Sequence, residues 1–289
     1  MPLTRRDFIR GSVSATLAVS VVGLPLSQSA QSAVNSSLVT VVRDENVMNK
    51  RFQVNKPILK SLVDETVLRI SGKSQVQAAW KSLFKTDDIV GLVPTPFMNP
   101  THPELVEVVK ESLIREVGIL ENNIIMAQGG KRRPGKCTAL ISMPALKGHW
   151  LTGIGTVIKN YIMYSGRPTR YHYANSAKLG EIWLIPEVKG KTRLVLVDAL
   201  HPLCDKGPQV DPRYKWAYHG LIASQDPVAA ETVCLKVLTE KRKAIRGEPW
   251  PISPPPICVE TADQVYKLGS SNWDDIKLVP SGWKKDLLL

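Results

Sequence analysis

The feature that most constrains the fold is a series of short apolar runs, each ended by proline, glycine or a polar residue. The runs are apolar at nearly every position, as expected of strands that are buried on both faces of a parallel sheet. Segments with helical spacing of apolar residues lie between them, which is the order of elements in α/β proteins. The predicted strands are Leu38–Val42, Ile89–Val93, Ile124–Ala127, Thr138–Met143 and Leu194–Asp198.

We therefore predict an α/β fold with three layers, in which a mainly parallel, Rossmann-like sheet carries helices on both faces. Thr101, together with Glu104, and Asp226 are expected to cap their helices. From about residue 249 the chain is rich in proline, and we expect an irregular C-terminal tail. The predicted helices begin near Pro57, Ser74, Thr101, Thr156, Asp226 and Thr261, and Tyr171 to Ile185 is predicted to form a helix or a pair of helical turns.

The N-terminus resembles an export signal rather than part of the fold. Arg5 and Arg6 form a twin-arginine signature, and a modestly apolar segment and several small residues follow it. That segment is too short, and too rich in serine and glycine, to be a stable membrane span. We predict that the twin-arginine translocase recognises residues 1–32 as a signal peptide and that residues 33–289 form a single periplasmic α/β domain without a transmembrane anchor. The alternative interpretation is an amphipathic N-terminal helix.

The chain is basic, with a formal net charge of +12 at pH 7, which suits small anions, anionic polymers or a membrane surface. No nucleic-acid recognition motif is present, and export argues against a nucleic-acid partner. The four cysteines, Cys137, Cys204, Cys234 and Cys258, have no CxxC spacing. They therefore do not form an iron–sulfur motif or a zinc site of their own. A disulfide between Cys204 and Cys258 is permitted in the periplasm, but nothing in the sequence requires it.

The richest chemistry follows the predicted strand Thr138–Met143, which Pro144 ends because proline donates no hydrogen bond to a ladder. Lys147 and His149 come next and, two residues apart in extended chain, would face the same side. Thr156 is expected to begin a helix with Lys159 and Asn160 in its first turn, where the helix dipole favours anions. The carboxyl edge of a parallel sheet is also where ligands usually bind. The alternative is that both lysines are solvated and the histidine is hydrogen-bonded locally.

Two further places carry candidate residues. Asp198 and His201 follow the clearest strand and would bind a divalent metal, or the carboxylate would orient the imidazole. A structural turn around Asp198 is an equally good interpretation. Lys131 lies in a basic loop with two glycines, which would cradle an anion or form a solvated turn. Candidate metal ligands are Asp198, His201 and His149, whereas His172 and His219 are interpreted as packing groups.

Three blocks of sequence together resemble the family known as "domain of unknown function 362", from about Val39 to Leu238. They are SMPALKGHWLTGIGTVIKN, VLVDALHPLCDKGPQ and GLIASQDPVAAETVCLKVL. The family name assigns no activity, so the resemblance implies an architecture and candidate positions rather than a reaction. Its members often carry a twin-arginine signal, and some carry ferredoxin-type cysteine motifs, which this chain lacks. Glu231 stands where the family usually has aspartate, and the longer side chain argues against a tight metal site there.

Three functions remain open. The first is an exported enzyme acting on a small anionic substrate, with or without a metal, in which the catalytic residues would be Lys147, His149, Lys159 and Asp198 and the substrate-binding residues Asn160, Thr156, Lys131 and His201. The second is a periplasmic anion-binding protein, and the third is an accessory subunit that binds a protein partner in a larger redox assembly. No serine elbow, HExxH motif or paired-glutamate spacing is present, so no standard hydrolase class has a motif to support it. The cofactor is left undetermined.

Overall fold

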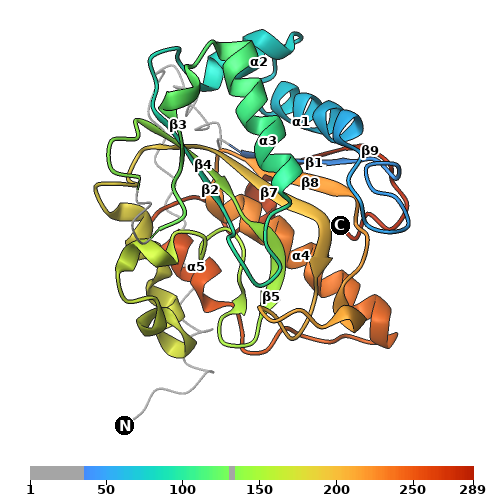
Figure 1. Ribbon diagram of the computed structural model, residues 1–289. Coiled ribbons are helices and arrows are strands. Elements are labelled where there is room, and N and C mark those ends of the chain that lie inside the picture. The colour runs from blue at the N-terminus through green and yellow to red at the C-terminus, as the bar shows by residue number, and fades with distance from the viewer. Residues whose placement is uncertain (1–35, 130–133) are drawn as a thin grey trace, which may run out of the picture. The chain divides into compact units, whose positions relative to one another are not determined.

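The computed structural model describes residues 36–129 and 134–289, and the strands of this part form one nine-stranded sheet (Figure 1). The predicted signal peptide with Arg5 and Arg6, and also Lys131, lie outside the described residues. The strands are β1 (Ser37–Arg43), β2 (Val90–Pro94), β3 (Ile124–Met126), β4 (Ala139–Met143), β5 (Ala145–His149), β6 (Gly153–Ile154), β7 (Thr192–Leu203), β8 (Gly220–Ser224) and β9 (Ile276–Gly282).

The order of strands across the sheet is β3-β2-β4-β7-β8-β1-β9. β8 runs antiparallel to β7 and β1, whereas the other neighbours along this path pair in parallel. β5 follows β4 directly after Pro144, pairs in parallel with β7 and forms a short antiparallel ladder with β6. The mainly parallel sheet that the apolar runs predict is therefore confirmed.

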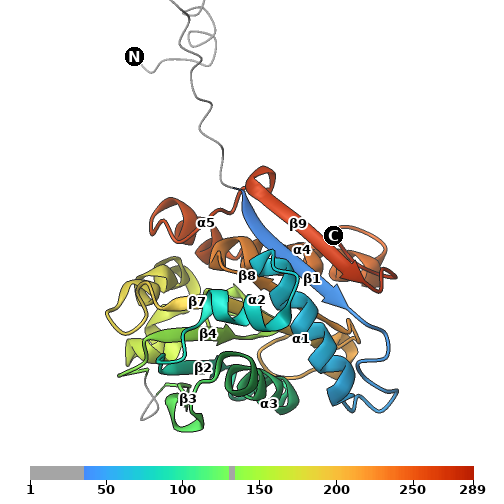
Figure 2. The same ribbon diagram turned by 90° about the horizontal axis from the view of Figure 1, so that it is seen from above.

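Helices cover both faces of the sheet, as Figure 2 shows from above. Alternate side chains of β7 enter different cores: Leu194 and Leu196 pack on the α1 side, and Val195 and Val197 on the α4 side. This alternation makes three layers, because each face of the sheet buries its own apolar set. The helices on one face are α1 (Lys56–Ser71), α2 (Val76–Leu83) and α3 (Pro103–Ser112), and those on the other are α4 (Pro227–Arg246) and α5 (Ile257–Gln264). No helix among the described residues is long and apolar enough to span a membrane.

Of the two helix N-caps predicted from the sequence, one is confirmed and one is wrong. The Asp226 carboxylate accepts hydrogen bonds from the amides of Val228 and Ala229 and caps α4, as predicted. The prediction for Thr101 is wrong: α3 begins one residue later, and the Thr101 hydroxyl donates to the Met143 carbonyl instead. Thr101 thus ties the loop after β2 to the end of β4.

Two predicted helices are not α-helices. The segment from Thr156 forms consecutive turns that lead into a 3₁₀ helix at Ile162–Ser165, because its β-branched residues disfavour an α-helix. The segment predicted from Tyr171 to Ile185 forms a 3₁₀ helix, Tyr173–Leu184, after a short 3₁₀ helix at Pro168–Tyr171, which agrees with the prediction of helical turns there. The helix-dipole argument for Lys159 therefore fails.

The C-terminal segment is ordered rather than irregular. It supplies α5 and then β9, whose seven residues pair in register with β1 from Ser37–Ile276 to Arg43–Gly282. β7 also extends past its predicted end at Asp198, to Leu203, because β5 continues to pair with it.

Arg43 attaches the C-terminus to the sheet. Its guanidinium carbon lies 4.1 Å from the centre of the Tyr218 ring and 4.5 Å from that of Trp283. The guanidinium also donates to the carbonyls of Tyr218 (2.8 Å) and Lys285 (2.7 Å), and the residue is only 2% exposed. This buried cation therefore joins β1 to Tyr218 and to the residues after β9 through carbonyls and ring faces.

We expect Arg43→Ala to lower the free energy of unfolding by about 2–4 kcal/mol, since it leaves buried carbonyls and ring faces without their partner. Arg51→Ala, at an exposed position, is the control and should change it by less than about 0.5 kcal/mol. Urea unfolding followed by tryptophan fluorescence measures both variants. Equal stability of the two would contradict the role assigned to Arg43.

Candidate functional site

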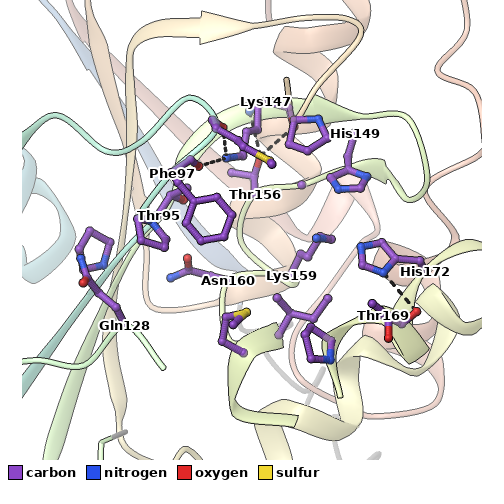
Figure 3. A pocket seen from close by; sticks show the side chains of 18 residues that line it. Thr95, Phe97, Gln128, Lys147, His149, Thr156, Lys159, Asn160, Thr169 and His172 are labelled. Carbon is purple, nitrogen blue, oxygen red and sulfur yellow. Dashed lines mark hydrogen bonds between the residues drawn. The ribbon is translucent and has the colours of Figure 1, made fainter. Parts of the chain in front are cut away.

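A cavity of about 370 Å³ lies at the carboxyl ends of β2, β3 and β4, where ligands bind in α/β sheets (Figure 3). Its walls come from the loop after β2, from β5, and from the turns at residues 155–160 and 162–172. The ionisable side chains among its described lining residues are Lys147, His149, Lys159 and His172. We call this cavity the lysine–histidine pocket.

β5 presents Lys147 and His149 to the pocket together. They are alternate residues of one strand, so both side chains project from the same face. Although both are ionisable, Lys147 is only 5% exposed and His149 only 6%. Thr156 fixes the adjoining turn to this strand, because its hydroxyl bonds to the Lys147 amide (3.2 Å) and carbonyl (3.3 Å).

Lys147 holds the loop that follows β2. Its Nζ donates to the Met98 carbonyl at 2.6 Å and reaches those of Asn99 (3.4 Å) and Phe97 (3.5 Å). Met98 and Asn99 have positive φ values of 54° and 62°, a conformation that these bonds help to maintain. Burial, with the charge of Lys159 as a second cause, lowers the pKa of Lys147 to about 7.

The Lys159 amine, unlike that of Lys147, is not hydrogen-bonded to backbone carbonyls of the described chain. Within the described part of the chain, no hydrogen-bond acceptor lies within reach of its amine, and its side chain extends across the pocket toward His149 and His172 (Figure 3). Burial lowers the pKa of this amine to about 8. Lys159 is therefore the cation of the pocket that remains available to a ligand.

Asn160, next to it, is already engaged. Its amide nitrogen donates to the Val93 carbonyl (2.8 Å) and to the Ser142 hydroxyl (2.9 Å). These bonds fix the turn to β2 and β4. Asn160 thus helps to position Lys159; it also lines the pocket, and its role in substrate binding stays a prediction.

The two histidines of the pocket lie with their ring centres 5.4 Å apart, at an interplanar angle of 27°. His149 Nδ1 accepts from the Leu151 amide (3.1 Å), so the neutral ring carries its proton on Nε2. Burial, followed by the charge of Lys159, lowers the pKa of His149 to about 3, and this imidazole is uncharged at neutral pH. His172 Nδ1 lies 3.3 Å from the Thr169 carbonyl. A Cβ at Gly155 would lie 3.2 Å from the His149 ring, so glycine lets the turn approach it.

His172 was interpreted from the sequence as a packing group, yet it lines the pocket. Its position in a polar, aromatic segment gave no periodic signal. The one available signal is Gly166, which lies between Lys159 and His172. A glycine turn at that point allows the segment with His172 to fold back toward Lys159.

A buried carboxyl group on α4 fixes the turn that carries Lys159. Glu231 is 0% exposed, and its Oε2 accepts the Val157 amide at 2.6 Å. Burial raises the pKa of Glu231 to about 8, while the amides of Val157, Ile158 and Thr156 act in the opposite direction. Its other oxygen, Oε1, has no hydrogen-bond partner among the described residues. The carboxyl group is therefore largely neutral in the fold at pH 7.

Asp198 lies outside the lysine–histidine pocket. Its Oδ2 accepts from the backbone amide of His102 and lies 2.7 Å from His102 Nδ1, and its Oδ1 accepts the Leu200 amide. Although burial acts to raise the pKa of Asp198, His102 and these amides hold it below the ordinary value. Asp198 thus anchors the start of α3 rather than balancing Lys147. His102, which the sequence interpretation missed, is signalled only by its place just before Pro103.

The predicted metal ligands do not gather. His201 stacks on Phe52 with ring centres 4.1 Å apart, His149 lies in the pocket, and Asp198 pairs with His102. Among residues 36–129 and 134–289, no group of three His, Cys, Asp or Glu side chains is placed to hold a metal ion. All four cysteines are buried and free, so Cys204 and Cys258 are not joined.

Replacing Glu231 tests its role in the turn. Glu231→Ala should lower the free energy of unfolding by about 2–4 kcal/mol, because buried amides lose their acceptor and a cavity remains. Glu231→Gln keeps an oxygen for the Val157 amide and should be much milder at pH 6. Because burial raises the pKa of Glu231, the stability of the wild type relative to Glu231→Gln should fall as the pH rises toward about 8. This comparison cancels the opposite contribution of Lys147 and Lys159, whose lowered pKa values make the stability of both proteins rise with pH.

Urea unfolding at several pH values between 6 and 9 measures both effects. Equal losses for the two variants would contradict the role of Glu231, as would a stability of the wild type relative to Glu231→Gln that rises across this range.

Comparison with known proteins gives one match. Residues 131–236 match the family model described as "Domain of unknown function (DUF362)". The matched region includes β5, the turn with Lys159, β7 and the first half of α4 with Glu231. No curated protein and no solved structure matches the chain. The match thus supports the family resemblance that the motifs indicate.

Proposed function

We propose that this protein is an enzyme that binds a small organic anion in the lysine–histidine pocket and acts on it. The observation that carries the proposal is the composition of the pocket: two lysines and two histidines, with no carboxylate among its described lining residues. Buried cations without a counter-charge destabilise a fold unless something offsets their lost hydration. An anionic ligand supplies that missing charge.

The remaining walls favour an organic anion over an inorganic one. Phe97, Met98, Ile162 and Met163 line the pocket together with several prolines. Sites for small organic molecules typically combine such apolar walls with a few polar groups that fix the orientation. An anion with an apolar body fits both parts of the surface.

Catalysis, rather than binding alone, is supported by the protonation states. The amines of Lys159 and Lys147, with pKa values of about 8 and 7, are close to the point at which they gain and lose protons at neutral pH. Next to them, the neutral His149 offers an N–H donor. Groups that exchange protons near the working pH are suited to general acid–base catalysis. A pocket that only captures anions is served better by fixed charges.

We also propose that the protein is exported to the periplasm by the twin-arginine route. The support is the sequence of its first residues, with the paired Arg5 and Arg6 ahead of an apolar segment. Replacing both arginines with lysine should leave unprocessed protein in the cytoplasm, as fractionation and immunoblotting would show. Normal accumulation of the double variant in the periplasm would refute this route.

Replacing Lys159 tests the anion-binding role. With phenyllactate as the probe, Lys159→Met should weaken binding about 10- to 100-fold, since a charge-assisted hydrogen bond is worth about 1.5–3 kcal/mol. Wild-type affinity should decrease as the pH rises above about 8, because Lys159 then loses its proton. Isothermal titration calorimetry measures both.

The control is Lys178→Met, an exposed lysine outside the pocket, which should bind as the wild type does. Undiminished binding by Lys159→Met, or an affinity that increases with pH, would refute the proposal.

A further inference from the structure

We propose that Lys159 forms an imine with the carbonyl group of its substrate, so that the substrate class is small oxo acids with an apolar body. This inference rests on the proposed function, because it assigns a substrate class to the same pocket. It goes beyond anion binding in one respect: the amine becomes a nucleophile.

Geometry distinguishes Lys159 from the second lysine. The Lys147 amine is directed at three backbone carbonyls, and a nucleophilic role would release the loop they belong to. The Lys159 amine lines the same cavity, and no acceptor of the described chain binds it. Its backbone is fixed from two sides, by Asn160 bonded to β2 and β4, and by Glu231 bonded to the Val157 amide. A free amine on a fixed turn is the arrangement that imine-forming lysines require.

The surroundings keep a useful fraction of this amine unprotonated. Burial lowers its pKa to about 8, and no carboxylate among the described lining residues of the pocket stabilises the cation. Only a neutral amine has the lone pair that attacks a carbonyl carbon. Lys147, whose amine is about half protonated at pH 7, adds positive potential for the carboxylate of an oxo acid, and that bound anion in turn stabilises its charged form.

The two protons that the carbonyl oxygen takes up are those that the Lys159 nitrogen gives up, and they pass through solvent. The Lys159 nitrogen bonds to the carbonyl carbon, and the carbonyl oxygen becomes a hydroxyl group by taking a proton. That hydroxyl then leaves as water with a second proton, and the nitrogen forms a double bond to the carbon. Overall, a protonated amine and a carbonyl give a protonated imine and one water, so no oxidant or reductant is needed. The His149 Nε2–H, on the side of the pocket toward which Lys159 extends (Figure 3), keeps its proton and stabilises the developing hydroxyl group by a hydrogen bond.

The test uses the purified wild-type protein with phenylpyruvate as the probe and phenyllactate as the matched acid without a ketone. Sodium cyanoborohydride reduces an imine to a stable secondary amine, and peptide mapping by mass spectrometry locates it. We expect the reduced adduct on Lys159 with phenylpyruvate and no adduct with phenyllactate. Lys159→Arg keeps a cation but should lose the adduct, whereas Lys178→Arg, at an exposed position, should retain it.

Mapping of the wild-type protein does not depend on whether the variant folds. An adduct on Lys147, or one spread over exposed lysines, would overturn the proposal. Binding of both acids by calorimetry with no adduct would also overturn it, while leaving the anion-binding function intact. If neither acid binds, the proposed function fails as well.

Discussion

The hydrogen bond from the Val157 amide to Glu231 is the interaction on which the site depends. It joins residues 74 positions apart and connects α4 to the turn that carries Lys159. A polar side chain buried in a helix is tolerated when it satisfies backbone groups that have no other partner. Here the satisfied groups belong to a turn whose β-branched residues disfavour an α-helix. Without Glu231, the turn that carries Lys159 would be held to the sheet only by the bonds of Thr156 and Asn160.

Burying lysines in the pocket lowers the free energy of unfolding, and the rest of the fold offsets that loss. Each face of the sheet has its own apolar core, and the C-terminal strand β9 is attached to β1 through its ladder and through Arg43. These elements lie away from the pocket, and their backbone groups are paired in the ladder or with Arg43. The pocket instead contains lysines whose pKa values are lowered, which means that burial disfavours their charged forms. Ionisable groups with shifted pKa values, in a fold whose other buried polar groups are paired, are typical of functional sites.

Local patterns predicted the three layers, five of the strands in the sheet and the cap of α4. Apolar runs and helix caps depend on residues that are adjacent in the sequence, so they can be recognised there. They also placed Lys147, His149 and Lys159 near one strand end, which the structure brings into one cavity. The errors arose where distant residues decide. Thr156 begins no helix, since Glu231 from α4 binds the turn, and Asp198 does not face the lysines, since His102, 96 positions away, pairs with it. The C-terminal tail forms β9 only because β1 offers a free edge, which no local pattern in a proline-rich segment reveals.

The most direct measurement is the titration of the Lys159 side chain by NMR, with the resonance assigned through a Lys159→Arg spectrum. The account predicts a pKa of about 8 in the free protein, where burial lowers it. It further predicts an increase when a carboxylic acid such as phenyllactate fills the pocket, because the bound anion stabilises the cation. A pKa near the ordinary value of 10.5 that does not change when the anion is added would contradict the claim that Lys159 is a buried amine that binds the anionic ligand.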